Sequence, residues 1–178
     1  AIISGMYATY HGPKGLKEIG KRIHSLTSLL ASSLKKHGYK IIHDTFFDTI
    51  CFEAHAWESK AKESRVNFRN FEDGRVGISL DETTTLNDVK KILRIFNASL
   101  GESHKNKLPN NLLRSTSYLE HPVFNSYQSE TKMLRYIHTL ESKDLSLNTS
   151  MIPLGSCTMK LNSTTEMEAV TWNEYANI

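Results

Sequence analysis

Apolar residues recur at steps of three and four along residues 14–37, the spacing that places them on one face of a helix. The stripe consists of Leu16, Ile19, Ile23, Leu26, Leu30 and Leu34. Pro13 suits the first turn of a helix and Gly38 suits the position after its last turn. Lys35 and Lys36 fall in the last turn, where the helix dipole favours cations. The pattern therefore predicts a helix over residues 14–37.

The pattern becomes extended after this helix. Residues 39–42 and 45–53 are rich in aromatic and β-branched residues, which strands prefer. Residues 66–71 and 75–80 form a second pair of extended runs, and residues 72–74 supply a turn that ends in glycine. We expect the helix to bury Leu16, Ile23, Leu26 and Leu30 against a sheet that carries Phe52, Val76 and Ile78.

Two further helices are predicted in this region. Residues 55–64 have a weak apolar stripe, whereas the helix after Thr85 has a strong one. Thr85 is a natural N-cap for this helix, with Asp88 three residues later. Its stripe consists of Leu86, Val89, Ile92, Leu93 and Phe96. Helices that cover one face of a small antiparallel or mixed sheet make residues 1–97 an α+β domain.

The pattern changes again after residue 97. Residues 98–122 are loop formers with little apolar content and read as a linker or a surface excursion. Ser129 is placed to cap a helix that runs to Leu140, with the stripe Met133, Leu134, Ile137 and Leu140. Residues 142–165 are moderately apolar but have no period, so they need another surface to cover them. Neither end of the chain resembles a natural terminus, and we expect an interior piece of a longer protein.

Composition narrows the class of protein. The chain has 178 residues, with 22 Lys and Arg against 19 Asp and Glu, for a formal charge of +3. This scattered charge does not indicate a nucleic-acid partner, and no apolar run is long enough to span a membrane. Two cysteines, Cys51 and Cys157, do not make a disulfide scaffold, and reduced thiols are the simpler expectation.

The segment most suited to chemistry is SMIPLGSCTMKLN, residues 150–162. Hydroxyls, a thiol and exposed backbone N–H groups beside a Pro/Gly turn can bind an anion or line a pocket. Cys157 can act as a nucleophile only beside a base, and Lys160 can in principle form a Schiff base. On spacing alone the sequence favours a structural connector with a buried cysteine. The candidate lining residues are Ser156, Cys157, Thr158, Lys160 and Asn162.

Other reactive residues give weaker signals. The eight histidines do not show metal-ligand spacing, and no metal site is expected. Asp44, Asp48 and Glu53 lie on or near one predicted strand, where paired carboxylates can do acid–base work. A solvated strand edge is the simpler interpretation. The sequence contains no glycine-rich phosphate loop.

Several segments together resemble glycine decarboxylase, the pyridoxal-phosphate protein of the glycine cleavage system. They are ATYHGPKGL (8–16), FFDTI (46–50), GISLDETTT (77–85), HPVFNSYQSET (121–131), SMIPLGSCTMKLNS (150–163) and TWNEYANI (171–178). The resemblance runs nearly end to end. One departure is Gln128, where we expect histidine, so a polar role at that position is in doubt.

The resemblance implies a protein of two related halves, each with the aminotransferase-like fold of type I pyridoxal-phosphate enzymes. Residues 1–97 would be the small C-terminal domain of the first half, 98–149 the connection with its helix, and 150–178 the start of the catalytic second half. The cofactor lysine would lie beyond Ile178, so no catalytic residue and no certain cofactor ligand is expected in this chain. The segment alone would be inactive.

The whole enzyme would be a homodimer that releases CO2 from glycine and passes the aminomethyl group to the lipoyl carrier protein. Such an enzyme would be cytoplasmic in a bacterium and mitochondrial in a eukaryote. The alternative hypothesis treats residues 1–97 as a free-standing small-molecule-binding or interaction module. The apolar, unpatterned segment 150–163 discriminates between the two hypotheses, because a free-standing module does not need such a segment.

Overall fold

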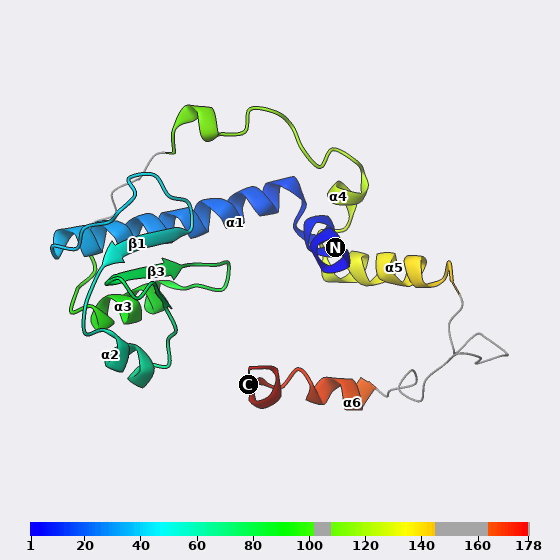
Figure 1. The fold of residues 1–178 in the computed structure, drawn as a ribbon. Helices are drawn as coiled ribbons and strands as arrows, with labels where there is room; N and C mark the ends of the chain where they lie inside the picture. Colours follow the sequence, from blue (N-terminus) through cyan, green and yellow to red (C-terminus); the bar gives the residue numbers. More distant parts are fainter. Residues whose placement is uncertain (102–107, 145–163, 178) are drawn as a thin grey trace. The chain divides into compact units, whose positions relative to one another are not determined.

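The computed structural model describes residues 1–101, 108–144 and 164–177. The chain divides into two compact units, residues 1–125 and 126–178, and each is considered by itself (Figure 1). The first unit contains a three-stranded sheet and its covering helices. The predicted α+β arrangement is therefore confirmed.

Helix α1 (Ile2–Lys36) is broken at Gly12, where the backbone has φ 62° and ψ 178°. A short helix precedes the break, and the predicted helix starts at Pro13. Its end is a Schellman motif, because Gly38 has φ 88° and the Tyr39 N–H donates to the Leu34 carbonyl over 3.1 Å. The prediction for residues 14–37 is confirmed, whereas the preceding helix was not predicted.

The sheet has the order β1-β3-β2 and is antiparallel throughout. Its strands are β1 (Thr49–Glu53), β2 (Arg69–Asn70) and β3 (Arg75–Ser79). Gly74 has φ 87° in the turn between β2 and β3, as the sequence predicts. The register places Phe52 opposite Val76, so both side chains lie on the buried face.

Helices α2 (Glu58–Glu63) and α3 (Leu86–Ile95) follow the predicted positions. Thr85 and Asp88 form a reciprocal capping box at the start of α3. Four of the five predicted stripe residues of α3 are buried, but Leu86 is 43% exposed. Leu86 is the first residue of the helix, and the buried face starts one turn later at Val89.

The core lies where the end of α1 meets β1 and α3. Its most buried side chains include Leu30, Leu34, Ile50, Phe52, Val76, Val89 and Leu93. Leu16, Ile23 and Leu26 are half-buried rather than fully buried. Ile23 and Leu26 nevertheless pack against this core, so the predicted face of the helix is correct there. Helix α1 extends past the sheet (Figure 1), so only its last turns have a layer to cover them.

Polar contacts fix the place where the chain leaves α3. The Gly101 N–H donates to Ser33 Oγ over 2.9 Å, and the Ser99 N–H donates to His37 Nε2 over 3.2 Å. Ser33 is fully buried because this chain segment covers it. Residues 99 and 101 are thus held against the end of α1.

Later elements are short, and they are η1 (Asn110–Leu112), α4 (Val123–Ser126), α5 (Glu130–Glu141), α6 (Thr164–Ala169) and α7 (Asn173–Ala176). Ser129 caps α5 by accepting from the Lys132 N–H, as predicted. Of the predicted α5 stripe, Met133 is buried, but Leu134 is 60% and Ile137 42% exposed. Within the described ranges, no helix is both long and apolar enough to cross a membrane.

Candidate functional site

The predicted lining residues fall outside the described residues. Ser156, Cys157, Thr158, Lys160 and Asn162 all belong to the range 145–163. The structure therefore does not place them, and their assignment stays a prediction. The described part of the chain offers two other features: the segments that carry the family resemblance, and one surface pocket.

The segment 8–16 surrounds the break in α1. Gly12 adopts a φ/ψ combination that is essentially restricted to glycine. Thr9 is buried, and its hydroxyl donates to the Gly5 carbonyl over 2.9 Å. From the other side, the Tyr118 hydroxyl donates to the Pro13 carbonyl over 2.6 Å. The chain therefore turns a defined corner at Gly12, which polar contacts of Thr9 and Tyr118 hold in place.

Aromatic side chains cluster at this corner. The His11 ring lies 4.2 Å from the Tyr7 ring and 5.2 Å from the Tyr10 ring, between centroids. Burial raises the pKa of Tyr7, and the neighbouring Glu82 carboxylate raises it further through its charge and a hydrogen bond. Glu82 belongs to the segment 77–85, so this segment lies beside Tyr7, the residue that directly precedes segment 8–16.

The loop in segment 77–85 is fixed by its own side chains. Asp81 Oδ1 accepts from the backbone N–H and the hydroxyl of both Thr83 and Thr84. These bonds, the Thr83 hydroxyl first, lower the pKa of Asp81. Arg22 of α1 then donates to the Glu82 and Thr84 carbonyls, each over 2.7 Å. The loop is thereby attached to α1.

The segment 46–50 is attached to the same helix. The His24 ring stacks on Phe47 with centroids 5.7 Å apart and an interplanar angle of 5°, and His24 Nδ1 lies 3.0 Å from the Phe47 carbonyl oxygen. The Asp48 carbonyl accepts from the Leu80 N–H over 2.9 Å. Segments 46–50 and 77–85 are therefore both attached to α1, the helix that contains segment 8–16, and the three form a scaffold.

This scaffold does not contain an acid–base pair of carboxylates. The Asp48 side chain accepts from the Thr49 hydroxyl over 2.9 Å, Asp44 lies 3.8 Å from exposed Lys35, and Glu53 is exposed. The solvated-edge interpretation therefore fits the geometry. No group of three or more metal-ligating side chains occurs within the described ranges, and Cys51 is a free thiol.

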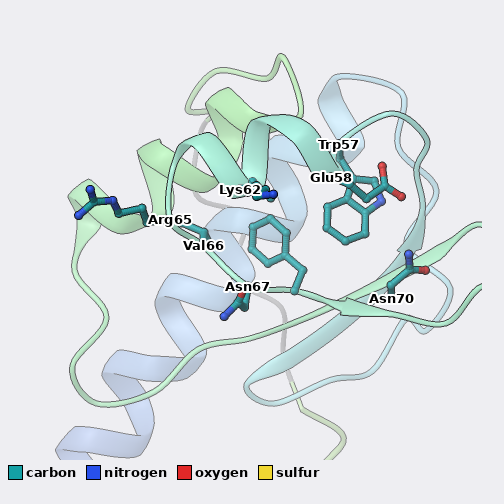
Figure 2. A pocket seen from close by; sticks show the side chains of 9 residues that line it. Trp57, Glu58, Lys62, Arg65, Val66, Asn67 and Asn70 are labelled. Carbon is teal, nitrogen blue, oxygen red and sulfur yellow. The ribbon is translucent and has the colours of Figure 1, made fainter. Parts of the chain in front are cut away.

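The pocket lies between α2 and β2 and has a volume of about 590 Å³. Trp57 and Ala61 are its buried floor, and Val66 and Phe68 are half-buried walls. Figure 2 shows Glu58 beside Trp57 at one end and Arg65 at the other. The remaining lining residues are Lys62, Asn67 and Asn70. An apolar floor with a polar rim can receive a ligand or a peptide.

Residues 1–96 match the family model of the glycine cleavage system P-protein. The chain belongs to this family. Curated relatives extend the similarity to the whole chain. The glycine dehydrogenase (decarboxylating) of Nostoc punctiforme is 48% identical over 100% of this chain, and that of Thermosynechococcus vestitus is 49% identical over 98%. The mitochondrial enzyme of Mus musculus is 45% identical over 100%. The chain spans about a fifth of the length of these relatives.

Sequence reasoning missed two features of this P-protein segment. The corner at Gly12 was signalled by the dipeptide Gly12-Pro13, because glycine permits the unusual backbone and proline starts the next helix. The pocket had no comparable signal, since its lining comes from a short helix, a turn and a strand whose packing the sequence pattern does not specify.

Proposed function

We propose that this chain is the part of a glycine decarboxylase that connects the two halves of the enzyme. Residues 1–97 are the small domain of the first half, 98–149 the connection, and 150–178 the start of the catalytic half. The observation that carries this proposal is the similarity to glycine dehydrogenases (decarboxylating) over the whole chain, at about a fifth of their length. A free-standing module is not supported by that extent.

The intact enzyme releases CO2 from glycine and transfers the aminomethyl group to the lipoyl carrier protein, and it is a homodimer. Pyridoxal phosphate, when bound, supplies the electron sink for decarboxylation. Relatives include bacterial enzymes and a mitochondrial one. This enzyme is accordingly cytoplasmic in a bacterium or mitochondrial in a eukaryote.

The described residues do not fit pyridoxal phosphate by themselves. The pocket beside α2 is floored by Trp57 and Ala61, and Glu58 in the first turn of α2 would repel a phosphate. Lys62 and Arg65 are exposed on its rim and provide no enclosed amine. We infer from the resemblance that the cofactor lysine lies beyond Ile178. The contribution of residues 1–101 is therefore a scaffold for the catalytic half.

The segment 150–163 lines or supports the active-site mouth in the intact enzyme. Its apolar residues need a cover, and its small hydroxyls and Gly155 let the backbone approach a ligand closely. The competing interpretation is that the segment only holds the interface between the two halves. In both cases its partner surface lies outside this chain.

The test is made in the intact parent protein. Thr158→Ala and Lys160→Ala should lower the rate of glycine decarboxylation more than they lower the melting temperature, because they remove polar groups at the mouth. Turnover is measured by release of labelled CO2 and stability by thermal unfolding. Full turnover in both variants, together with earlier melting, would show that the segment is structural. A parent without glycine decarboxylation would refute the proposed function itself.

A further inference from the structure

The pocket between α2 and β2 adjoins an open sheet edge. The Phe71 N–H donates to the Arg75 carbonyl, so these two residues form a hydrogen-bonded pair. Asn70 opposes Val76 in the next position. Hydrogen-bonded and non-hydrogen-bonded pairs alternate along an antiparallel ladder, so Asn70 and Val76 form a non-hydrogen-bonded pair. The backbone N–H and C=O of Asn70 therefore point away from β3. Strand β2 is an edge strand of the described sheet. Its residue Asn70 also lines the pocket.

The rim of the pocket carries an unusual arginine. The Val66 N–H donates to the Ala61 carbonyl and the Arg65 N–H to the Lys62 carbonyl, so α2 ends in a Schellman motif with Arg65 at the left-handed position. Arg65 has φ 52°, where glycine or asparagine is favoured. The backbone at this position therefore does not require an arginine.

Charge is distributed unevenly along the pocket. Arg65 and Lys62 are exposed at the pocket rim, and neither forms an ion pair with another described residue. Glu58 lies at the Trp57 end, opposite Arg65 (Figure 2). An occupant is thus favoured in one orientation, with a carboxylate near Arg65. Its apolar side chains would cover Trp57 and Phe68.

We propose that this pocket and the outer edge of β2 receive an extended segment of the same polypeptide, from the part of the protein outside residues 1–178, with an acidic side chain beside Arg65. The segment adds a strand to β2 through the outward backbone groups of Asn70. This inference rests on the proposed function, which makes the chain part of a longer polypeptide.

The length of the protein supports an occupant from the same chain. The curated relatives are about five times longer than this chain, so most of the polypeptide is available to pack against it. An exposed sheet edge beside an aromatic floor is a feature that natural proteins cover. A segment held by covalent connection also reaches the edge at a high effective concentration.

Amide hydrogen exchange, resolved to single residues, tests the proposal. In the purified parent, the Asn70 amide should exchange about tenfold or more slowly than in the isolated chain, because an added strand protects it. The Gly77 amide, in the central strand, is the internal reference. Equal exchange of Asn70 in the two proteins would overturn the proposal. Protection that appears only after a separate carrier protein is added would also overturn it, in favour of an intermolecular partner.

Two variants of the parent make the test independent of the isolated chain. Arg65→Gly relieves the left-handed backbone but removes the cation, so the Asn70 amide should exchange faster while the melting temperature holds. Ala56→Gly is the matched control, because Ala56 also has a positive φ, 55°, is exposed and does not line the pocket. Unchanged exchange at Asn70 in Arg65→Gly would contradict the proposal. Both variants are assayed for glycine decarboxylation, so a failure of docking in an active parent is separate from a failure of the proposed function.

Discussion

At Gly12 a single residue decides the direction of the chain. Its φ of 62° and ψ of 178° place the backbone in a region that other residues enter only with strain. Pro13 then starts the long helix. Its lack of an N–H costs no hydrogen bond there, because the first N–H groups of a helix have no partner within it. Residue identity and backbone geometry are therefore matched at this corner.

Gly12→Ala should destabilise the first unit by about 1–3 kcal/mol, because alanine adopts this backbone region only with strain. Gly5 is the control: it lies within the preceding helix, and a Cβ there would meet no atom within 4 Å. Gly5→Ala should be stabilising by about 0.5–1 kcal/mol. Urea unfolding of the two variants measures both changes. An equal effect of the two substitutions would show that the corner is not constrained.

Burial distinguishes two leucines of the same predicted stripe. Leu30 is fully buried, whereas Leu26 is half-buried. Leu30→Ala should lower the free energy of unfolding by about 2–5 kcal/mol, and Leu26→Ala by clearly less. Urea unfolding at constant m-value is the measurement. A cost at Leu26 that equals the cost at Leu30 would contradict the observed helix orientation.

Individual elements follow closely from local sequence signals. Helix α3 is the clearest case, because the pattern predicts Thr85 and Asp88 as its capping pair and the structure contains the reciprocal bonds. The β2–β3 turn is similar, since Gly74 supplies the positive φ. Such signals act within a few residues, so a single sequence contains them.

The capping box should make the stability of α3 depend on pH. Hydrogen bonds from the Thr85 hydroxyl and backbone lower the pKa of Asp88 from its ordinary value of 3.8. The folded pKa is thus below the unfolded one, so the stabilisation is complete above the unfolded pKa and is lost as pH falls through the folded pKa. Thr85→Ala should cost about 1 kcal/mol near neutral pH, and Asp88→Asn should flatten the acid limb of stability against pH. Thr85→Ser should retain most of the stabilisation by the capping box. Acid unfolding curves that coincide for all variants would refute the predicted pH dependence.

What the sequence could not predict depends on contacts between distant residues. The period of the first helix is correct, yet which of its turns are buried depends on the length of the sheet beneath, so Leu16, which we expected to be buried, is only half-buried. The pocket depends on packing of Trp57 against Phe68, with ring centroids 5.7 Å apart. The segment 150–163 has no period, and its assignment therefore rests on the family resemblance alone.

At the scale of the whole molecule, the described residues form a scaffold, and we propose that the chemistry lies elsewhere in the polypeptide. Arg22, His24 and Thr27 of α1 bind the carbonyl groups of residues 47, 48, 82 and 84. These contacts hold segments 46–50 and 77–85 against α1. Exposed apolar side chains at Leu112, Leu134 and Val170 agree with a chain that is one part of a longer protein.

The isolated chain should bind pyridoxal phosphate weakly or not at all, because we propose that the cofactor lysine lies beyond Ile178. Absorbance titration of the chain beside the intact parent is the measurement, followed by borohydride reduction and mapping of modified lysines. A stable absorbance band in the isolated chain, trapped at Lys160, would contradict the prediction. Lys160→Ala serves as the control for nonspecific reaction at surface lysines.

The contact between α1 and α3 has a consequence for synthesis of the protein. The apolar face at Leu30 and Leu34 leaves the ribosome before the residues that will cover it, because α3 begins at Leu86. At translation rates of ~5–20 residues per second, the roughly 50 intervening residues take about 3–10 s to appear. During that interval the nascent helix presents an uncovered apolar surface, which is a substrate for chaperones and a site for premature aggregation. Slow codons placed between residues 37 and 85 would lengthen this exposure and lower the yield of folded protein.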